Sequence, residues 1–180
     1  MLQIKALEPK DSFLFDCGDD DMNDFFHNDA VPHTELLLAK TYVYYDTDTP
    51  NQAIGFFTVL NDSIKGQKVE QFREALPNEK RYPFFPAVKI GRLGRDSKFK
   101  GSKYGQKILD DIKHSFTFNN KTGCCFITVD AYNKENLLKF YQNNGFIFLS
   151  DKDQNKETRV MYYNLLTYKK NFEAAMKARQ

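Results

Sequence analysis

The stretch Val88–Leu109 constrains the fold more than any other part of the chain. It reads as an apolar strand ending near Asp96, a basic loop containing glycine, and a helical pattern that begins almost at once. A strand that leads through a loop into a helix can bind pyrophosphate, because free backbone N–H groups and the positive end of the helix dipole face the anion. Gly101 and Gly105 let the backbone approach closely. The pattern predicts a phosphorylated cofactor, with a solvated basic turn as the alternative.

The loop excludes two common phosphate-binding motifs. It lacks the Gly-Lys-Ser/Thr of nucleoside-triphosphate loops and the three-glycine dinucleotide fingerprint. Positive charge is concentrated here, since seven Lys or Arg lie between Lys89 and Lys107, whereas the net charge of the chain is only +2. The overall charge therefore does not by itself indicate a nucleic-acid partner.

The same segment resembles the acetyl-coenzyme A motif of the GNAT N-acetyltransferase superfamily, Gln/Arg-x-x-Gly-x-Gly/Ala. The last glycine of the motif matches, and lysines replace its first residue and its middle glycine. The resemblance implies that acetyl-CoA is the cosubstrate, with its pyrophosphate at the loop and its pantetheine arm along the strand. The implied contacts are Leu93, Gly94, Arg95, Lys100, Gly101, Ser102, Lys103, Tyr104 and Gly105.

A second segment resembles another block of this superfamily, a strand and a helix followed by Tyr-x-x-x-Gly-Phe. Here the strand ends at Thr128–Ala131 and the helix closes with Phe140–Phe146. The resemblance implies that Tyr141 is the general acid that returns a proton to the cofactor thiolate. It also implies that Asn133, just before the helix, contacts the cofactor.

The N-terminal region resembles one branch of the superfamily, which includes toxins that acetylate aminoacyl-tRNA. The matching residues are Phe15–Gly18, then Met22, Phe25, Phe26 and Ala30, and also Gly91–Gly94. The activity implied is acetyl transfer to a primary amine by direct attack. The acceptor stays open: a generic small or protein amine ranks before aminoacyl-tRNA because the net charge is small. A non-catalytic acyl-CoA-binding module is the third option, and a tRNA, an antitoxin or a second copy of the chain are the candidate partners.

The expected fold is a three-layer α/β/α sandwich of the GNAT acyltransferase type, with a mixed central sheet and splayed parallel strands. The 180 residues, 41% hydrophobic, suit one acetyltransferase domain (1–166) with a helical extension (167–180). Proline is expected to end a helix at Pro32 and to break the chain at Pro86. A strand is expected over Ala53–Leu60. No apolar run suits a membrane span and no signal-peptide core is visible, so we expect a cytoplasmic protein.

Other chemistry is less well defined by the residues. Asp96, Asp130 and the three histidines are general-base candidates by residue type alone. No Cys, His and carboxylate spacing indicates a metal site. Arg92 and Arg95 are candidate phosphate contacts if the acceptor is tRNA.

Overall fold

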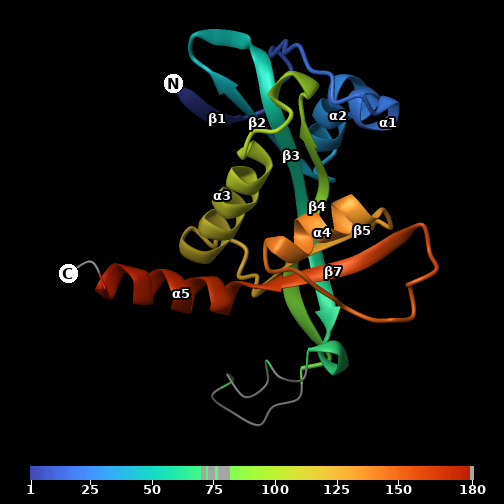
Figure 1. Cartoon of the computed structure of the whole chain (residues 1–180), viewed down its shortest axis with the longest axis vertical. Helices are drawn as coiled ribbons and strands as arrows, with labels where there is room; N and C mark the ends of the chain where they lie inside the picture. Colours follow the sequence, from blue (N-terminus) through green and yellow to red (C-terminus); the bar gives the residue numbers. More distant parts are fainter. Residues whose placement is uncertain (70–71, 73–75, 77–81, 179–180) are drawn as a thin grey trace. The chain divides into compact units, whose positions relative to one another are not determined.

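The computed structural model describes residues 1–69, 72, 76 and 82–178 (Figure 1). Its strands are β1 Leu2–Ala6, β2 Lys40–Asp46, β3 Thr49–Lys65, β4 Phe84–Arg95, β5 Phe126–Tyr132, β6 Ile147–Phe148 and β7 Thr158–Asn164. Its α-helices are α1 Asp20–Asp24, α2 Ala30–Glu35, α3 Tyr104–Phe118, α4 Glu135–Asn143 and α5 Leu165–Lys177. A π-helix, η1 Phe25–Asp29, joins α1 to α2, and single 3₁₀ turns form η2 Gly66–Lys68 and η4 Ser97–Phe99.

The strands form one mixed sheet in the order β1-β2-β3-β4-β5-β7-β6. β1, β2 and β3 pair antiparallel, as do β5, β7 and β6. The contacts of β4 and β5 advance in the same chain direction, from Pro86 with Cys125 to Lys89 with Asp130, which makes these two strands parallel. A parallel pair requires a crossover connection, and α3 supplies it.

The chain divides into two compact units. The elements β3, β4 and α3 each contribute residues to both units. The first unit contains residues 1–60 and 90–109, and its core gathers around Phe15, Phe25, Phe26 and Phe56. Within it, α2 packs against β2. The second unit contains residues 61–89 and 110–180, with a core cluster that includes Phe85, Phe126 and Tyr162.

The N-terminal helical segment continues past the point where the sequence predicted a stop. The side chain of Asp19 caps α1 by accepting from the N–H of Met22 at 3.1 Å. The helix then passes through η1 into α2, in which Pro32 is the third residue. The predicted interruption at Pro32 is wrong. The helical segment continues through Pro32, which follows the π-helix η1, where the regular i→i−4 hydrogen-bond pattern is already altered.

Two strands are longer than predicted. β3 extends five residues beyond Leu60, through Asn61, Asp62 and Ser63, and β4 begins at Phe84 and includes Pro86. The predicted break at Pro86 is wrong because this residue pairs through its carbonyl oxygen, which accepts from the N–H of Cys125 at 3.0 Å. The polar residues of β3 are tolerated because one of them, Asp62, bonds to neighbouring strands.

The helix end at Gly145 is confirmed. The N–H of Phe146 donates to the carbonyl of Tyr141 at 3.0 Å, and the N–H of Gly145 donates to Gln142 at 2.9 Å. This is a Schellman motif, and Gly145 has the positive φ of +82° that the motif requires. It fixes the chain direction between Tyr141 and β6. The predicted tail helix corresponds to α5, and residues 179–180 of the predicted extension lie outside the described residues.

Candidate active site

Asp96 organises the basic loop of the first unit. It is 2% exposed, and its Oδ1 accepts from the N–H of Lys98 at 2.9 Å. Its Oδ2 accepts from the N–H of Asp16 at 2.9 Å and from Nε2 of Gln52 at 3.0 Å. Both carboxylate oxygens are therefore occupied in fixing the turn after β4. This structural role argues against Asp96 as a general base. Its partners Gln52 and Asp16 are 44 and 80 residues away, so no local pattern could indicate them.

The start of α3 presents the features of an anion site. Gly101 has φ +84°, and no atom lies within 4 Å of the Cβ position it lacks, so the space beside the loop is open. The first regular turn begins at Lys103, whose carbonyl accepts from the N–H of Lys107. The N–H groups of Tyr104, Gly105 and the next residue have no acceptor inside the helix. These donors and the helix dipole favour a phosphate group.

The three loop lysines look equivalent in the sequence, but they differ in their side-chain contacts. Lys98 Nζ donates to Gln52 Oε1 at 2.7 Å and is committed to the turn. Lys100 and Lys103 are exposed and have no recorded partner among the described residues. Ser102 donates its hydroxyl to the carbonyl of Phe99 at 2.6 Å, and Arg95 Nη1 donates to the same oxygen at 2.7 Å. Lys100 and Lys103 are therefore the cations available to a ligand.

Two glycines of β4 lie where an added side chain would collide with side chains of β3. A Cβ added at Gly91 would meet the side chain of Leu60 at 3.0 Å, and one added at Gly94 would meet Phe56 at 2.7 Å. Glycine at these two positions therefore lets β4 pass close to the side chains of β3 in the stretch where the pantetheine arm is predicted.

We expect Gly94→Ala to lower the free energy of unfolding by about 1–3 kcal/mol, because its methyl group would overlap the buried ring of Phe56. Gly91→Ala is the matched control, since the one close contact of its methyl group is with the flexible end of Leu60. Urea unfolding of both variants measures the difference. Equal losses would show that the close packing of Gly94 against Phe56 does not constrain the strand.

Asn133 is positioned by its own loop contacts. Both hydrogens of its amide are used, donating to the carbonyls of Gln154 at 2.8 Å and Lys156 at 2.9 Å. Its backbone N–H donates to Glu157 at 2.8 Å. Asn133 therefore ties the end of β5 to the loop before β7, and only its side-chain oxygen is left for a cofactor.

Tyr141 lies on α4 in the second unit and is 7% exposed. Its ring packs against Phe146 at a centroid distance of 5.4 Å and against Phe140 at 5.2 Å. In the described part of the chain, its hydroxyl has no recorded hydrogen-bond partner. The oxygen is not among the buried polar atoms of the described residues that lack a partner, so the ring is buried while the hydroxyl remains accessible. Burial raises the pKa of Tyr141 above its ordinary value of 10.0, so the phenol stays protonated and can act as an acid.

Asp130 belongs to a charged cluster that the sequence did not reveal. Lys89 Nζ lies 2.9 Å from Asp130 Oδ2 and 3.8 Å from Asp62 Oδ2. Thr128 donates its hydroxyl to Asp62 Oδ2 at 2.5 Å. These residues come from β3, β4 and β5. The extension of β3 beyond Leu60 brings Asp62 into the cluster. The polar residues that follow Leu60 were the one feature of the sequence that could have indicated this cluster.

The three histidines have structural surroundings. His27 Nε2 lies 2.9 Å from the carbonyl oxygen of Phe15, and the ring of His33 packs edge-on against Phe25. His114 packs against aromatic side chains of α3 and α5, namely Phe118, Tyr168 and Phe172. These contacts favour packing roles over a general-base role for the histidines.

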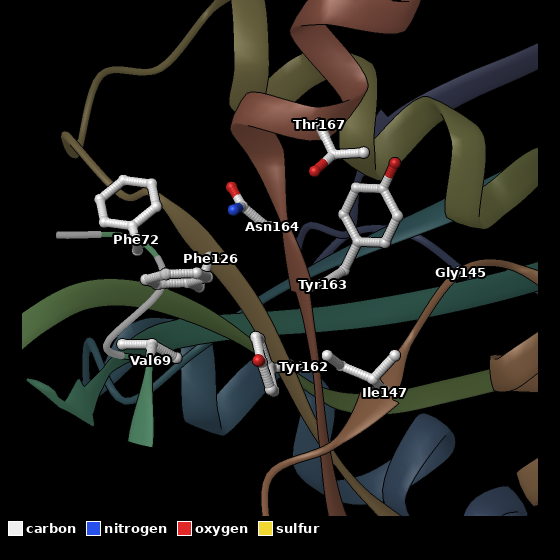
Figure 2. A pocket seen from close by; sticks show the side chains of 9 residues that line it. All are labelled: Val69, Phe72, Phe126, Gly145, Ile147, Tyr162, Tyr163, Asn164 and Thr167. Carbon is white, nitrogen blue, oxygen red and sulfur yellow. The ribbon is translucent and has the colours of Figure 1, made fainter. Parts of the chain in front are cut away.

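A separate pocket of about 230 Å³ lies in the second unit (Figure 2). Its walls include Phe72, Phe126, Tyr162 and Tyr163, with Asn164 and Thr167 at the start of α5. It contains none of the residues predicted to bind the cofactor.

No described helix is both long and apolar enough to cross a membrane. Among the described residues, no three His, Cys, Asp or Glu side chains gather in a way that could hold a metal ion.

The predicted site residues thus fall into two groups. Leu93, Gly94, Arg95 and the loop Lys100–Gly105 come together in the first unit. Tyr141 and Asn133 belong to the second unit, as does the Asp130 cluster.

Comparisons with known proteins connect this arrangement to one class. No protein-family model matches the sequence. A curated protein of Sinorhizobium fredii, described as a probable TacT toxin, is 29% identical over 111 residues, which are 60% of this chain and 59% of that protein. The chain therefore matches somewhat more than half the length of this relative.

Solved structures match nearly the whole chain. AtaT complexed with acetyl-methionyl-tRNAfMet superposes with a TM-score of 0.77 at 21% identity, covering 96% of this chain and 99% of AtaT. An AtaT variant bound to acetyl-CoA and to the C-terminus of the antitoxin AtaR gives a TM-score of 0.73 at 20% identity, covering 95% and 98%. These matches confirm the predicted fold class. The chain has the GNAT N-acetyltransferase fold, in the form that the AtaT toxin also adopts.

Proposed function

We propose that the protein is an acetyl-CoA-dependent N-acetyltransferase whose acceptor is the amino group of an aminoacyl-tRNA. The observation that carries the enzymatic part is Tyr141, a buried tyrosine whose hydroxyl has no recorded partner in the described part of the chain. In the described structure its oxygen is not among the buried polar atoms that lack a partner, so it is accessible to a ligand. A purely binding module has no need for such a group.

The residues of the first unit fit a pyrophosphate. The N–H groups at the start of α3, the open space beside Gly101 and the uncommitted Lys100 and Lys103 offer donors and positive charge at one loop. Arg95 and Ser102 brace the loop through the carbonyl of Phe99. Backbone groups of Leu93, Gly94 and Arg95 at the end of β4 would pair with the amide groups of a pantetheine arm, and an N–H there would polarise the thioester carbonyl.

In the proposed reaction the neutral amine attacks the thioester carbonyl carbon, the C–N bond forms and the C–S bond breaks. Tyr141, which stays protonated because burial raises its pKa, donates its phenolic proton to the thiolate as the C–S bond breaks. The proton lost by the amine passes to water. We assign no residue as general base, although Asp130 is exposed enough to contact an ammonium group.

The comparisons favour aminoacyl-tRNA as the acceptor, which the sequence alone placed after a generic amine. The match to a probable TacT toxin and the whole-chain match to AtaT bound to acetyl-methionyl-tRNAfMet support aminoacyl-tRNA over a generic amine. An AtaT structure with the antitoxin AtaR supports an antitoxin as a partner of this chain as well.

We expect free thiol to be released from acetyl-CoA when charged tRNA is present, and not when the same tRNA is uncharged, because only the aminoacyl group carries the attacking amine. A thiol-reactive dye measures release, and mass spectrometry of the hydrolysed aminoacyl group identifies the N-acetyl product. Small amines serve as the comparison acceptors. Release with small amines alone would restore the generic acceptor, and acetyl-CoA binding without release across a panel of aminoacyl groups would favour the binding module.

A further inference from the structure

Arg92, on β4 in the first unit, is only partly satisfied by its surroundings. Its Cζ lies 5.2 Å from the centroid of the Phe25 ring, and its Nη2 lies 3.3 Å from Asp21 Oδ2. Its Nε is buried and has no hydrogen-bond partner in the described structure. A buried N–H of a charged group without an acceptor is unfavourable. The resting arrangement of Arg92 therefore leaves one strong donor unused.

The guanidinium group of Arg95 has different contacts from that of Arg92, although both arginines were equal candidates for phosphate contacts in the sequence. Arg95 Nη1 donates to the carbonyl of Phe99 at 2.7 Å, so this guanidinium braces the loop. Among the described residues Arg92 has one charged partner, and that ion pair is exposed: the side chains are 34% exposed for Arg92 and 64% for Asp21. Exposed ion pairs contribute little to stability and are easily exchanged. Arg92 is therefore the arginine that is free to change partner.

We propose that Asp21 is an internal stand-in for phosphate, and that Arg92 exchanges it for a backbone phosphate near the single-stranded 3′ end of an RNA acceptor. This inference rests on the proposed aminoacyl-tRNA function. A guanidinium binds a phosphate through two parallel N–H donors, and an Nε together with an adjacent Nη forms such a fork. The unused Nε then gains an acceptor. The ring of Phe25 supports the plane of the guanidinium during the exchange.

The acidic residues around this position explain why the ligand should be a polyanion. Asp19 and Asp20 precede Asp21 at the start of α1, and their charges oppose the approach of an isolated phosphate ion. An RNA brings further phosphates that can bind elsewhere, so its binding can displace Asp21. The Asp21–Arg92 pair thus favours RNA over small anions.

The test measures the affinity of a short hairpin RNA with a single-stranded 3′ overhang by fluorescence anisotropy. We expect Asp21→Asn to tighten binding by about 2- to 5-fold at low salt, because it removes the competitor of the phosphate. Asp20→Asn is the matched control: it makes the same change in net charge one residue away, and Asp20 has no ion pair within the described part of the chain. Its effect should be clearly smaller.

Two further variants examine Arg92 itself. Arg92→Gln should weaken RNA binding roughly tenfold, because it removes a charge-assisted hydrogen bond. It should also lower the slope of log affinity against log salt by ~0.7. Arg92→Lys keeps the charge and the apolar stem over Phe25, so it should retain the slope while losing affinity. In the double variant Asp21→Asn with Arg92→Gln, the gain from Asp21→Asn should vanish, because Asp21 acts through Arg92.

Three results would overturn the inference: equal tightening by Asp20→Asn and Asp21→Asn, persistence of the Asp21→Asn gain without Arg92, or absence of RNA binding in every variant. Thermal unfolding checks that each variant is folded. Since this hairpin RNA carries no amino acid, its binding can be measured separately from the proposed acetyl transfer. Coupling between Asp21 and Arg92 without acetylation of charged tRNA would uphold the phosphate site and reject the activity. Acetylation of charged tRNA without coupling between Asp21 and Arg92 would support the activity and reject the phosphate site.

Discussion

Replacing Tyr141 by phenylalanine is expected to lower kcat for acetyl transfer by about 10²–10⁴-fold while leaving the affinity for acetyl-CoA nearly unchanged. The substitution removes only the hydroxyl, which has no recorded partner among the described residues, so the packing against Phe140 and Phe146 is retained. The variant should be at least as stable as the parent, because no intramolecular hydrogen bond is lost. Thiol release with saturating charged tRNA gives kcat, and calorimetry gives the acetyl-CoA affinity.

The pH profile provides a second check on Tyr141. A general acid must be protonated, so activity that depends on it is lost as pH rises through its pKa. Burial raises that pKa above 10.0, and activity should therefore show no alkaline loss caused by Tyr141 up to about pH 9. A decline at low pH should remain in both proteins, because the attacking amine must be neutral. Parental turnover in Tyr141→Phe would return this residue to a packing role.

Replacing Gly105 by aspartate is expected to abolish the protection that acetyl-CoA gives against thermal unfolding. At a ligand concentration of 100 Kd, this protection is ~2.7 kcal/mol in the parent. For a chain of this size it corresponds to roughly 5–10 °C in Tm. Gly105 is the second residue of α3, so a carboxylate there would lie beside the proposed pyrophosphate. Scanning calorimetry with and without acetyl-CoA measures the loss.

The same substitution should not destabilise the free protein. A negative charge in the first turn of a helix interacts favourably with the helix dipole, and aspartate is a better helix former than glycine. Gly105→Asn is the matched control, since it has nearly the same size without the charge. Loss of protection in both variants would point to steric exclusion at the loop. Full protection in Gly105→Asp would remove the start of α3 from the cofactor site.

Local patterns in the sequence were sufficient for most elements. The strand–loop–helix around Asp96 and the cap at Gly145 depend on neighbouring residues, and glycine at a position with positive φ is a local requirement. The errors arose where distant residues decide the outcome. Pro86 belongs to a strand because Cys125 bonds to its carbonyl, and β3 continues past Leu60 because Asp62 finds partners on β4 and β5.

The sequence by itself indicated the candidate cofactor loop, the position of Tyr141 after its strand, and the fold class, because each of these depends on contiguous residues. Only the tertiary structure decided what each side chain is free to do. It committed Asp96, Lys98 and Arg95 to the turn, and it left Arg92 with an unused donor beside Asp21. The physical reason is that a polar side chain is available for chemistry only when its hydrogen bonds are not already made, and its partners come from segments far away in the chain.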